Sequence, residues 1–123
     1  MGENQIFIAG QVASGKNSKR WVGHRLIRSK AGMKYIKDST PQWESNKEKF
    51  LELIKNKAFP LHIKFTLIRK TKARFDYVNL LQLPQDLMCW HGWIPDDDAN
   101  HLIPVIGEFV YDKENPGIII EVL

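Results

Sequence analysis

Apolar residues at every second position between residues 61 and 69 constrain the fold of this chain more than any other feature. Leu61, Ile63, Phe65 and Leu67 alternate with more polar neighbours, which is typical of a strand that buries one face and exposes the other. A sheet built on this strand needs a core against one face. A chain of 123 residues, 43% of them hydrophobic, is long enough for one domain with such a core.

Weaker patterns along the chain predict the other elements. Strands are expected over residues 5–12, 21–27, 104–111 and 117–122, the last one entered through a turn at Asn115-Pro116-Gly117. Helices are expected over residues 29–37, 41–57 and 79–90, with Pro41 at the start of the second and a kink or a late start at Pro84 in the third. Because these elements mix without regular alternation, we expect the α+β class: a small mixed or antiparallel sheet packed with two to three helices, in a single domain over residues 1–123.

Charge is divided sharply between the two parts of the chain. Residues 1–75 hold 17 Lys/Arg and 5 Asp/Glu, whereas residues 76–123 hold 1 and 9, so the formal balances are +12 and −8. A segment as basic as the first suits a polyanion such as nucleic acid. The acidic remainder would repel the same polyanion unless a divalent cation lay between them. The alternative is that the two parts pair with each other inside the fold.

The chain lacks the marks of a disulfide-bonded, membrane-spanning or secreted protein. Its one cysteine, Cys89, excludes an internal disulfide and a multi-cysteine zinc site, and we expect it to be a buried structural residue. No apolar run approaches the roughly 20 residues of a membrane span. No basic stretch precedes the short apolar segment near the N-terminus, so no signal peptide is expected. We therefore expect a soluble, cytoplasmic protein with no membrane partner.

The segment Gly10–Asn17 comes close to a phosphate-binding P-loop but misses it. The P-loop pattern requires a Mg²⁺-binding Ser or Thr after its lysine, and this chain has Asn17 there. The residues that follow also lack the apolar period of the helix that should hold the phosphate. Two interpretations remain: a solvated hairpin turn, or a loop whose donors bind a nucleic-acid backbone. The donors are Ser14, Lys16, Asn17 and Lys19.

Acidic residues gather around the third expected helix. Asp76 precedes the helix, Asp86 lies within it, and the triplet Asp96, Asp97 and Asp98 follows it. If the strand, helix and loop fold back on themselves, Asp76 meets the triplet, and a cluster of oxygen ligands suits Mg²⁺ or Mn²⁺. On the helix, Asn79, Gln82 and Asp86 share a polar face that could look at the same site. The alternatives are a helix cap for Asp76, a solvated loop for the triplet and an ordinary exposed position for Asp86.

The order and spacing of these motifs resemble one known family. The matching pieces are Asp76-Tyr77-Val78-Asn79-Leu80, Asp86-Leu87-Met88, Gly92-Trp93-Ile94-Pro95-Asp96-Asp97-Asp98, Gly10-Gln11 with the basic loop that follows, and Ser29-Lys30. Over roughly residues 5–105 the chain resembles the RusA family of phage-type Holliday junction resolvases, which are crossover junction endodeoxyribonucleases. Two positions depart from the family pattern, because Val78 stands where the family has a second aspartate and Gln82 where it has a lysine.

The resemblance implies a metal-dependent endonuclease that resolves four-way junctions in DNA recombination and repair. It implies a phage or prophage protein acting in the bacterial cytoplasm as a homodimer, with Mg²⁺, or Mn²⁺, as cofactor. Asp76 and Asp97 match metal-ligand positions, and Asp86 and Asp96 match their acidic neighbours; we expect catalysis from Asp76, Asp97 and Asp86. The basic loop and Arg69, Lys70, Lys72 and Arg74 would bind the DNA backbone. Because Val78 cannot ligate, the alternative is a weakened or inactive protein that still binds branched DNA.

Overall fold

The computed structural model describes residues 2–13, 19–22, 25–28 and 30–123, and side chains only outside residues 14–29. Nine elements follow one another along these residues. They are β1 (Gln5–Ala9), β2 (Lys19–Val22), β3 (Arg25–Arg28), α1 (Lys30–Ile54), β4 (Leu61–Arg69), α2 (Tyr77–Trp90), β5 (Leu102–Ile106), β6 (Val110–Tyr111) and β7 (Gly117–Val122). Neither helix combines the length and the apolar character that crossing a membrane would need.

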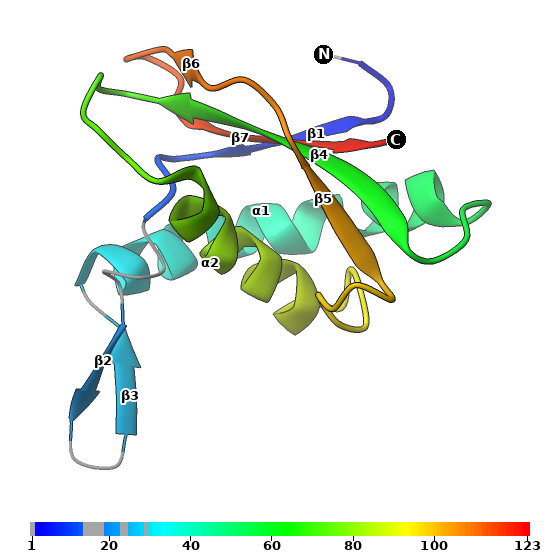
Figure 1. Ribbon diagram of the computed structural model, residues 1–123, viewed down its shortest axis with the longest axis horizontal. Coiled ribbons are helices and arrows are strands. Elements are labelled where there is room, and N and C mark those ends of the chain that lie inside the picture. Colours follow the sequence, from blue (N-terminus) through cyan, green and yellow to red (C-terminus); the bar gives the residue numbers. More distant parts are fainter. Residues whose placement is uncertain (1, 14–18, 23–24, 29) are drawn as a thin grey trace.

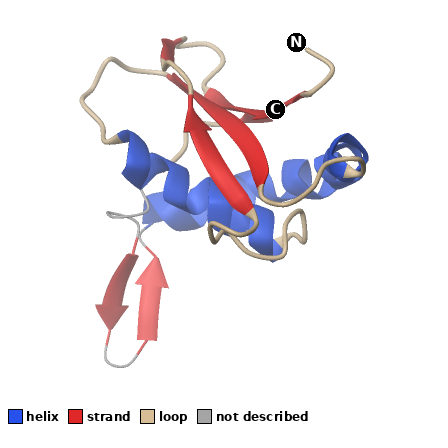
Figure 2. Cartoon of the chain, turned by 45° about the vertical axis from the view of Figure 1, so that its right-hand side comes forward, coloured by secondary structure: helices blue, strands red, loops and turns tan. Residues whose placement is uncertain are grey.

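A mixed five-stranded sheet forms the framework of the molecule. Its strands run in the order β1-β7-β4-β5, and β6 pairs with β4 beyond the end of β5. The β7 strand is antiparallel to both β1 and β4, whereas β5 and β6 run parallel to β4. Both helices lie against the same face of this sheet (Figures 1 and 2). The expected α+β class, with a small mixed sheet and two helices, is confirmed.

The alternating residues of β4 form the centre of the core. Leu61, Ile63, Phe65 and Leu67 are at most 2% exposed, and the residues between them are half-buried or exposed. The helices complete the core with the fully buried side chains Trp43, Phe50, Leu83, Leu87 and Met88. Burying an aliphatic or aromatic side chain of this size stabilises the fold by roughly 1.5–3 kcal/mol. The period-two pattern of the sequence therefore identifies the buried face of the central strand.

The two helices expected over residues 29–37 and 41–57 are one helix, α1, with Pro41 inside it. The expected break is wrong because a continuous buried stripe, which includes Tyr35, Trp43 and Phe50, holds both halves against the sheet. A proline inside a helix removes one amide donor and crowds the preceding turn. Two hydroxyls donate into that turn: Ser39 to the Tyr35 carbonyl at 2.7 Å and Thr40 to the Ile36 carbonyl at 2.6 Å.

The region after β1 is a hairpin of two short strands, where a single strand was expected over residues 21–27. The β2 and β3 strands pair antiparallel, with Trp21 opposite Leu26. The first described element after the Gly10–Asn17 segment is thus a strand and not a helix. This agrees with the rejection of a nucleotide P-loop, since among the described residues no helix N-terminus follows the segment directly to hold phosphates.

The expected strand over residues 104–111 is divided into β5 and β6, which pair with successive parts of β4. Gly107 lies at the division, where its amide donates to the Phe65 carbonyl at 2.8 Å. A Cβ there would meet Thr66 Oγ1 at 2.6 Å, so the close approach requires glycine. The last strand, β7, has the expected bounds of residues 117–122.

Candidate functional site

The end of α2 turns sharply, and this turn carries the acidic triplet back toward the helix. Gly92 adopts a φ of +75°, which favours glycine, and the amide of Trp93 donates to the Met88 carbonyl at 2.8 Å. Trp93 is then fixed in the core, because its ring stacks on Phe50 at 4.7 Å and its indole Nε1 donates to the Trp43 carbonyl at 2.9 Å. The loop that follows is therefore held at a set distance from α2.

Two residues of this loop, Asp96 and Asp97, meet Cys89 of α2. Together with Asp86, a neighbouring charge on α2, these residues are called the acidic cluster here. The ligand atoms of Cys89, Asp96 and Asp97 lie within 4.8 Å of one another. Asp86 precedes Cys89 by three residues, which places both on one helix face, and its carboxylate accepts from Gln82 Nε2 at 3.2 Å. The cluster is open to solvent, since Asp96 is exposed and the other three are half-buried.

Electrostatic repulsion and partial burial shape the cluster. The pKa of Asp97 is raised above its ordinary value, first by burial, then by its hydrogen bond with Asp96 and by the charges of Asp86 and Asp96. The pKa of the Cys89 thiol is raised to about 11 by burial and by the same carboxylates. At neutral pH the cluster thus offers carboxylate oxygens and a protonated thiol, a donor set for a hard divalent cation and not for a soft one.

Asp76 lies at the opposite end of α2 and does not join this cluster. It is the N-cap of the helix, and its Oδ1 accepts from the Val78 amide at 3.1 Å. Ten residues of helix separate Asp76 from Asp86, which corresponds to about 15 Å along the axis. Figure 1 shows the loop of residues 91–101 at the far end of α2 from its first residue. Within one chain, Asp76 and the triplet do not converge in one pocket, so that prediction is wrong. The alternative prediction, that Asp76 caps the helix, is confirmed.

The predicted polar face of α2 divides between the two ends of the helix. Gln82 donates a hydrogen bond to Asp86 at the acidic cluster, whereas Asn79 lines a cavity at the N-terminal end of α2. The third member of the triplet, Asp98, forms an ion pair with His101. The structure therefore brings together Cys89, Asp96 and Asp97, with Asp86 nearby on the same helix, and leaves Asp76, Asn79 and Asp98 outside.

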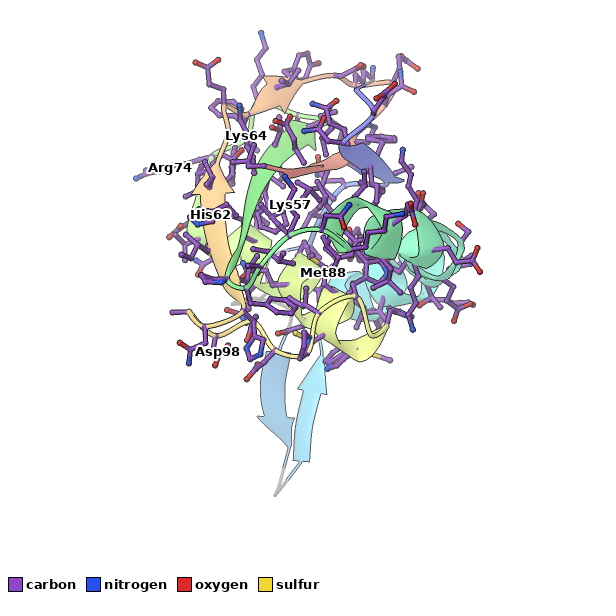
Figure 3. All side chains as sticks on the ribbon, turned by 90° about the vertical axis from the view of Figure 1, so that its right-hand side faces the viewer. Lys57, His62, Lys64, Arg74, Met88 and Asp98 are labelled. Atoms are coloured by element: carbon purple, nitrogen blue, oxygen red, sulfur yellow. The ribbon has the colours of Figure 1, made fainter. Side chains whose placement is uncertain are left out.

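The predicted DNA-binding residues also have different surroundings. Lys70, Lys72 and Arg74 are exposed, whereas Arg69 is only 9% exposed and donates from Nη1 to the Val12 carbonyl at 3.1 Å. Arg69 is therefore not an open surface contact. Arg74 and Asp98 lie well apart in Figure 3, so the basic and acidic groups are at different ends of α2. The structure of Ser14, Lys16 and Asn17, and the side chain of Lys19, fall outside the described residues.

One member of the cluster, Cys89, and one residue near it, Lys47, were not among the predicted site residues. Cys89 is half-buried beside the carboxylates and is not the fully buried structural residue that was expected; its spacing of three from Asp86 was the signal for this. Lys47 comes from α1, and a Cβ on Gly92 would lie 2.9 Å from its Nζ. Lys47 therefore places a positive charge at the base of the acidic loop. No local pattern marks Lys47, because α1 and α2 are far apart in sequence.

The capping role of Asp76 can be separated from a metal-binding role by two substitutions. Asp76→Asn keeps an acceptor oxygen for the Val78 amide, so we expect the free energy of unfolding to change little. Asp76→Ala removes the acceptor and should cost about 1 kcal/mol. Urea denaturation measures both. Mn²⁺ affinity should be the same in Asp76→Asn as in the natural chain, and a loss of tenfold or more would show that Asp76 holds metal after all.

No protein-family model matches the chain, and no curated protein sequence matches it. A function for this chain therefore has to come from its own residues and from the motif resemblance given above.

Proposed function

We propose that this protein is a metal-dependent endonuclease that cleaves branched DNA, with the acidic cluster as its catalytic centre. The observation that carries the proposal is the meeting of Asp96 and Asp97 with Cys89 on one open surface, close enough to Asp86 for its charge to act on Asp97. Burial first, then the hydrogen bond with Asp96 and the charges of Asp86 and Asp96, raise the pKa of Asp97. Four-way junctions as substrate, and recombination and repair as the setting, come from the resemblance of the motifs to RusA resolvases.

The residues of the cluster fit a Mg²⁺ ion, or Mn²⁺ in its place. Clustered carboxylates repel one another, and a divalent cation held between them removes that cost. Magnesium prefers oxygen ligands and keeps several waters, so two or three carboxylates on an open surface suffice. The family pattern implies a set of metal ligands that includes Asp76. That set does not fit here, because Asp76 is about 15 Å from Asp86 along α2. Asp96 and Asp97 would hold the ion, and Asp86 would complete the site.

The chemistry is hydrolysis of a phosphodiester, in which water adds to phosphorus and one bond from phosphorus to a sugar oxygen breaks. The bound cation supplies Lewis-acid polarisation of the phosphate. Gln82 orients the Asp86 carboxylate, and Trp93 fixes the loop that carries the other two. The ammonium group of Lys47, at the base of this loop, can pair with a non-bridging phosphate oxygen. The exposed Lys70, Lys72 and Arg74 bind the backbone without reading sequence.

A homodimer is part of the proposal, because two opposed strands of a junction need two sites. Each protomer would then contribute its own acidic cluster. The exposed apolar residues of the molecule would be buried in the dimer interface. Ile106, Phe109, Val110 and Tyr111 are each 46–57% exposed along one edge of the sheet. Light scattering of the protein at micromolar concentration reports the oligomeric state.

A second candidate is a protein that binds branched DNA without cutting it. The specific observation is Val78, which is 68% exposed in the first turn of α2 at the position of the family's second aspartate. With Val78 apolar and Asp76 used as a cap, the N-terminal end of α2 lacks the carboxylate pair of the family pattern. The two candidates share a substrate and differ only in cleavage.

A synthetic four-way junction tests both candidates at once. We expect paired nicks in Mg²⁺ or Mn²⁺, none in EDTA, and none on a linear duplex of the same sequence. Asp86→Asn should lower the cleavage rate at least about 100-fold, because Lewis-acid stabilisation contributes several kcal/mol. Junction affinity should be retained. Glu48→Gln, on the exposed surface of α1, is the matched carboxylate-to-amide control and should cleave normally.

The outcomes separate the candidates. Tight junction binding without cleavage in either metal would overturn the nuclease and favour the second candidate. Full activity in Asp86→Asn would remove the acidic cluster from the mechanism. A protein that neither binds nor cuts the junction contradicts both candidates.

A further inference from the structure

A cavity of about 840 Å³ lies at the N-terminal end of α2, away from the acidic cluster. Its walls come from the residues after β1, the first turn of α1, the end of β4, the segment that follows β4 and the first turn of α2. These walls are tied together, because the Lys70 amide donates to Gln11 Oε1 at 2.7 Å and Arg69 Nη1 donates to the Val12 carbonyl.

Arg69 is the unusual residue of this cavity. It lines the cavity while only 9% exposed, and its Nε has no hydrogen-bond partner within the part of the chain that the structure describes. Its guanidinium carbon lies 5.0 Å from the centre of the Phe75 ring, and none of the ion pairs formed among the described residues includes it. The Val12 carbonyl and the Phe75 ring contact this guanidinium, but no carboxylate among the described residues offsets its charge, so an anion that reaches it would be bound favourably.

The rest of the lining favours an anion as well. The positive end of the α2 dipole opens here, and Arg74 adds a second guanidinium. Asn79 contributes an amide group. Asp76 is the one carboxylate among the described lining residues, and its Oδ1 already accepts from the Val78 amide. Two guanidinium groups and a helix N-terminus outweigh this single negative charge.

A second cavity of about 410 Å³ continues the first, since both are lined by Gln11, Val12, Ala13 and Ala31. It contains another buried polar group without a described partner, the hydroxyl of Tyr35, which is 5% exposed. Lys70 lines the same space, and the ammonium group of Lys34 is paired with Asp38. These two adjoining cavities are called the groove here, and each contains a buried donor without a described partner.

We infer that this groove is a phosphoryl-binding site in which Arg69 and Arg74 hold the phosphate oxygens at the N-terminus of α2. Phosphate matches the planar, bidentate donors of arginine and the amide groups of a helix N-terminus. The phosphoryl group belongs either to a free phosphate compound or to a DNA backbone. The free-phosphate source is independent of nuclease activity, whereas the DNA source rests on the function proposed above.

Titration of ¹⁵N-labelled protein with inorganic phosphate, without metal, tests the site directly. The Arg69 Nε–H signal should shift and saturate with phosphate, and should stay in place with chloride at equal ionic strength. Arg74→Gln should weaken phosphate binding about tenfold, the equivalent of one charge-assisted hydrogen bond. Lys57→Gln is the matched control: it removes one exposed positive charge, does not line the cavity and should change affinity less than twofold.

A junction added to the phosphate-saturated protein identifies the source of the phosphoryl group. Displacement of phosphate from Arg69 by DNA shows that the groove holds a backbone phosphate. An Arg69 signal that keeps its phosphate-bound position while DNA binds elsewhere shows a site for a free phosphate compound. An Arg69 signal that responds to neither phosphate nor DNA, or equally to phosphate and chloride, overturns the inference. Because cleavage is not measured here, an inactive nuclease leaves this result interpretable.

Discussion

Replacing Asp97 with asparagine is expected to reduce Mg²⁺-dependent junction cleavage at least about 100-fold in kcat/KM, because it removes a charged ligand from the cation site. The same change should stabilise the fold in EDTA at pH values above the pKa of the Asp97 carboxyl. The folded-state pKa of Asp97 is raised, so the folded protein holds this proton more tightly than the unfolded chain. The stability that protonation supplies is lost as the pH rises through that pKa. The uncharged amide avoids this loss.

Asp98→Asn is the matched control for this prediction. Asp98 neighbours Asp97 in sequence but pairs with His101 and lies outside the acidic cluster. Its substitution should change cleavage less than about threefold, and should leave the stabilisation by Mg²⁺ in thermal melts intact. In Asp97→Asn the Mg²⁺-induced rise in Tm should shrink or vanish. If Asp98→Asn were the inactive variant and Asp97→Asn the active one, the cation would have to be placed on the other side of the loop.

The sequence identified the parts of the fold that depend on local period. The alternation from Leu61 to Leu67 marks the buried face of β4, and the turn at Asn115-Pro116-Gly117 precedes β7 as expected. The prediction from sequence failed at Pro41, where the preference of proline for the first turn of a helix predicted a helix start. The hydrogen bonds of Ser39 and Thr40 and the packing of α1 against the sheet outweigh that preference, and the packing comes from residues distant in the chain.

The sequence predicted the carboxylates of the candidate site, but it did not predict which of them lie together. Asp86, Asp96 and Asp97 were all candidates, yet their meeting depends on the turn at Gly92 and on the burial of Trp93 against α1. Asp76 was placed with them because a strand, helix and loop can fold back. The helix that lies between prevents this, since fourteen residues of α2 span about 21 Å.

Separation of the two ends of α2 also changes how the charge asymmetry should be interpreted. The basic residues around Arg74 and the acidic cluster do not pair, and each end of the helix presents its own sign of charge. A polyanion bound at the basic end can reach the acidic end only where a cation offsets the carboxylates. Metal should therefore raise DNA affinity as well as permit cleavage, which distinguishes this arrangement from a purely basic DNA-binding surface.

Trp93→Ala is expected to lower the free energy of unfolding by about 3–5 kcal/mol, the cost of removing a large buried aromatic side chain. Trp93 is 1% exposed, packs against Trp43 at 5.1 Å and Phe50 at 4.7 Å, and satisfies the Trp43 carbonyl. Urea denaturation in EDTA measures the loss. Trp90→Ala, at a tryptophan that is 57% exposed, is the matched control and should cost less than about 1 kcal/mol.

Trp93→Phe separates the contribution of the ring from that of the indole hydrogen bond. Phenylalanine keeps an aromatic contact with Phe50 but leaves the buried Trp43 carbonyl without this donor, which should cost about 1–3 kcal/mol. Because Trp93 anchors the loop that bears Asp96 and Asp97, this folded variant should also bind Mn²⁺ more weakly than the natural chain. Unchanged Mn²⁺ affinity together with reduced stability would mean that the loop keeps its position without the indole, and would contradict the anchoring role of the Trp93 hydrogen bond.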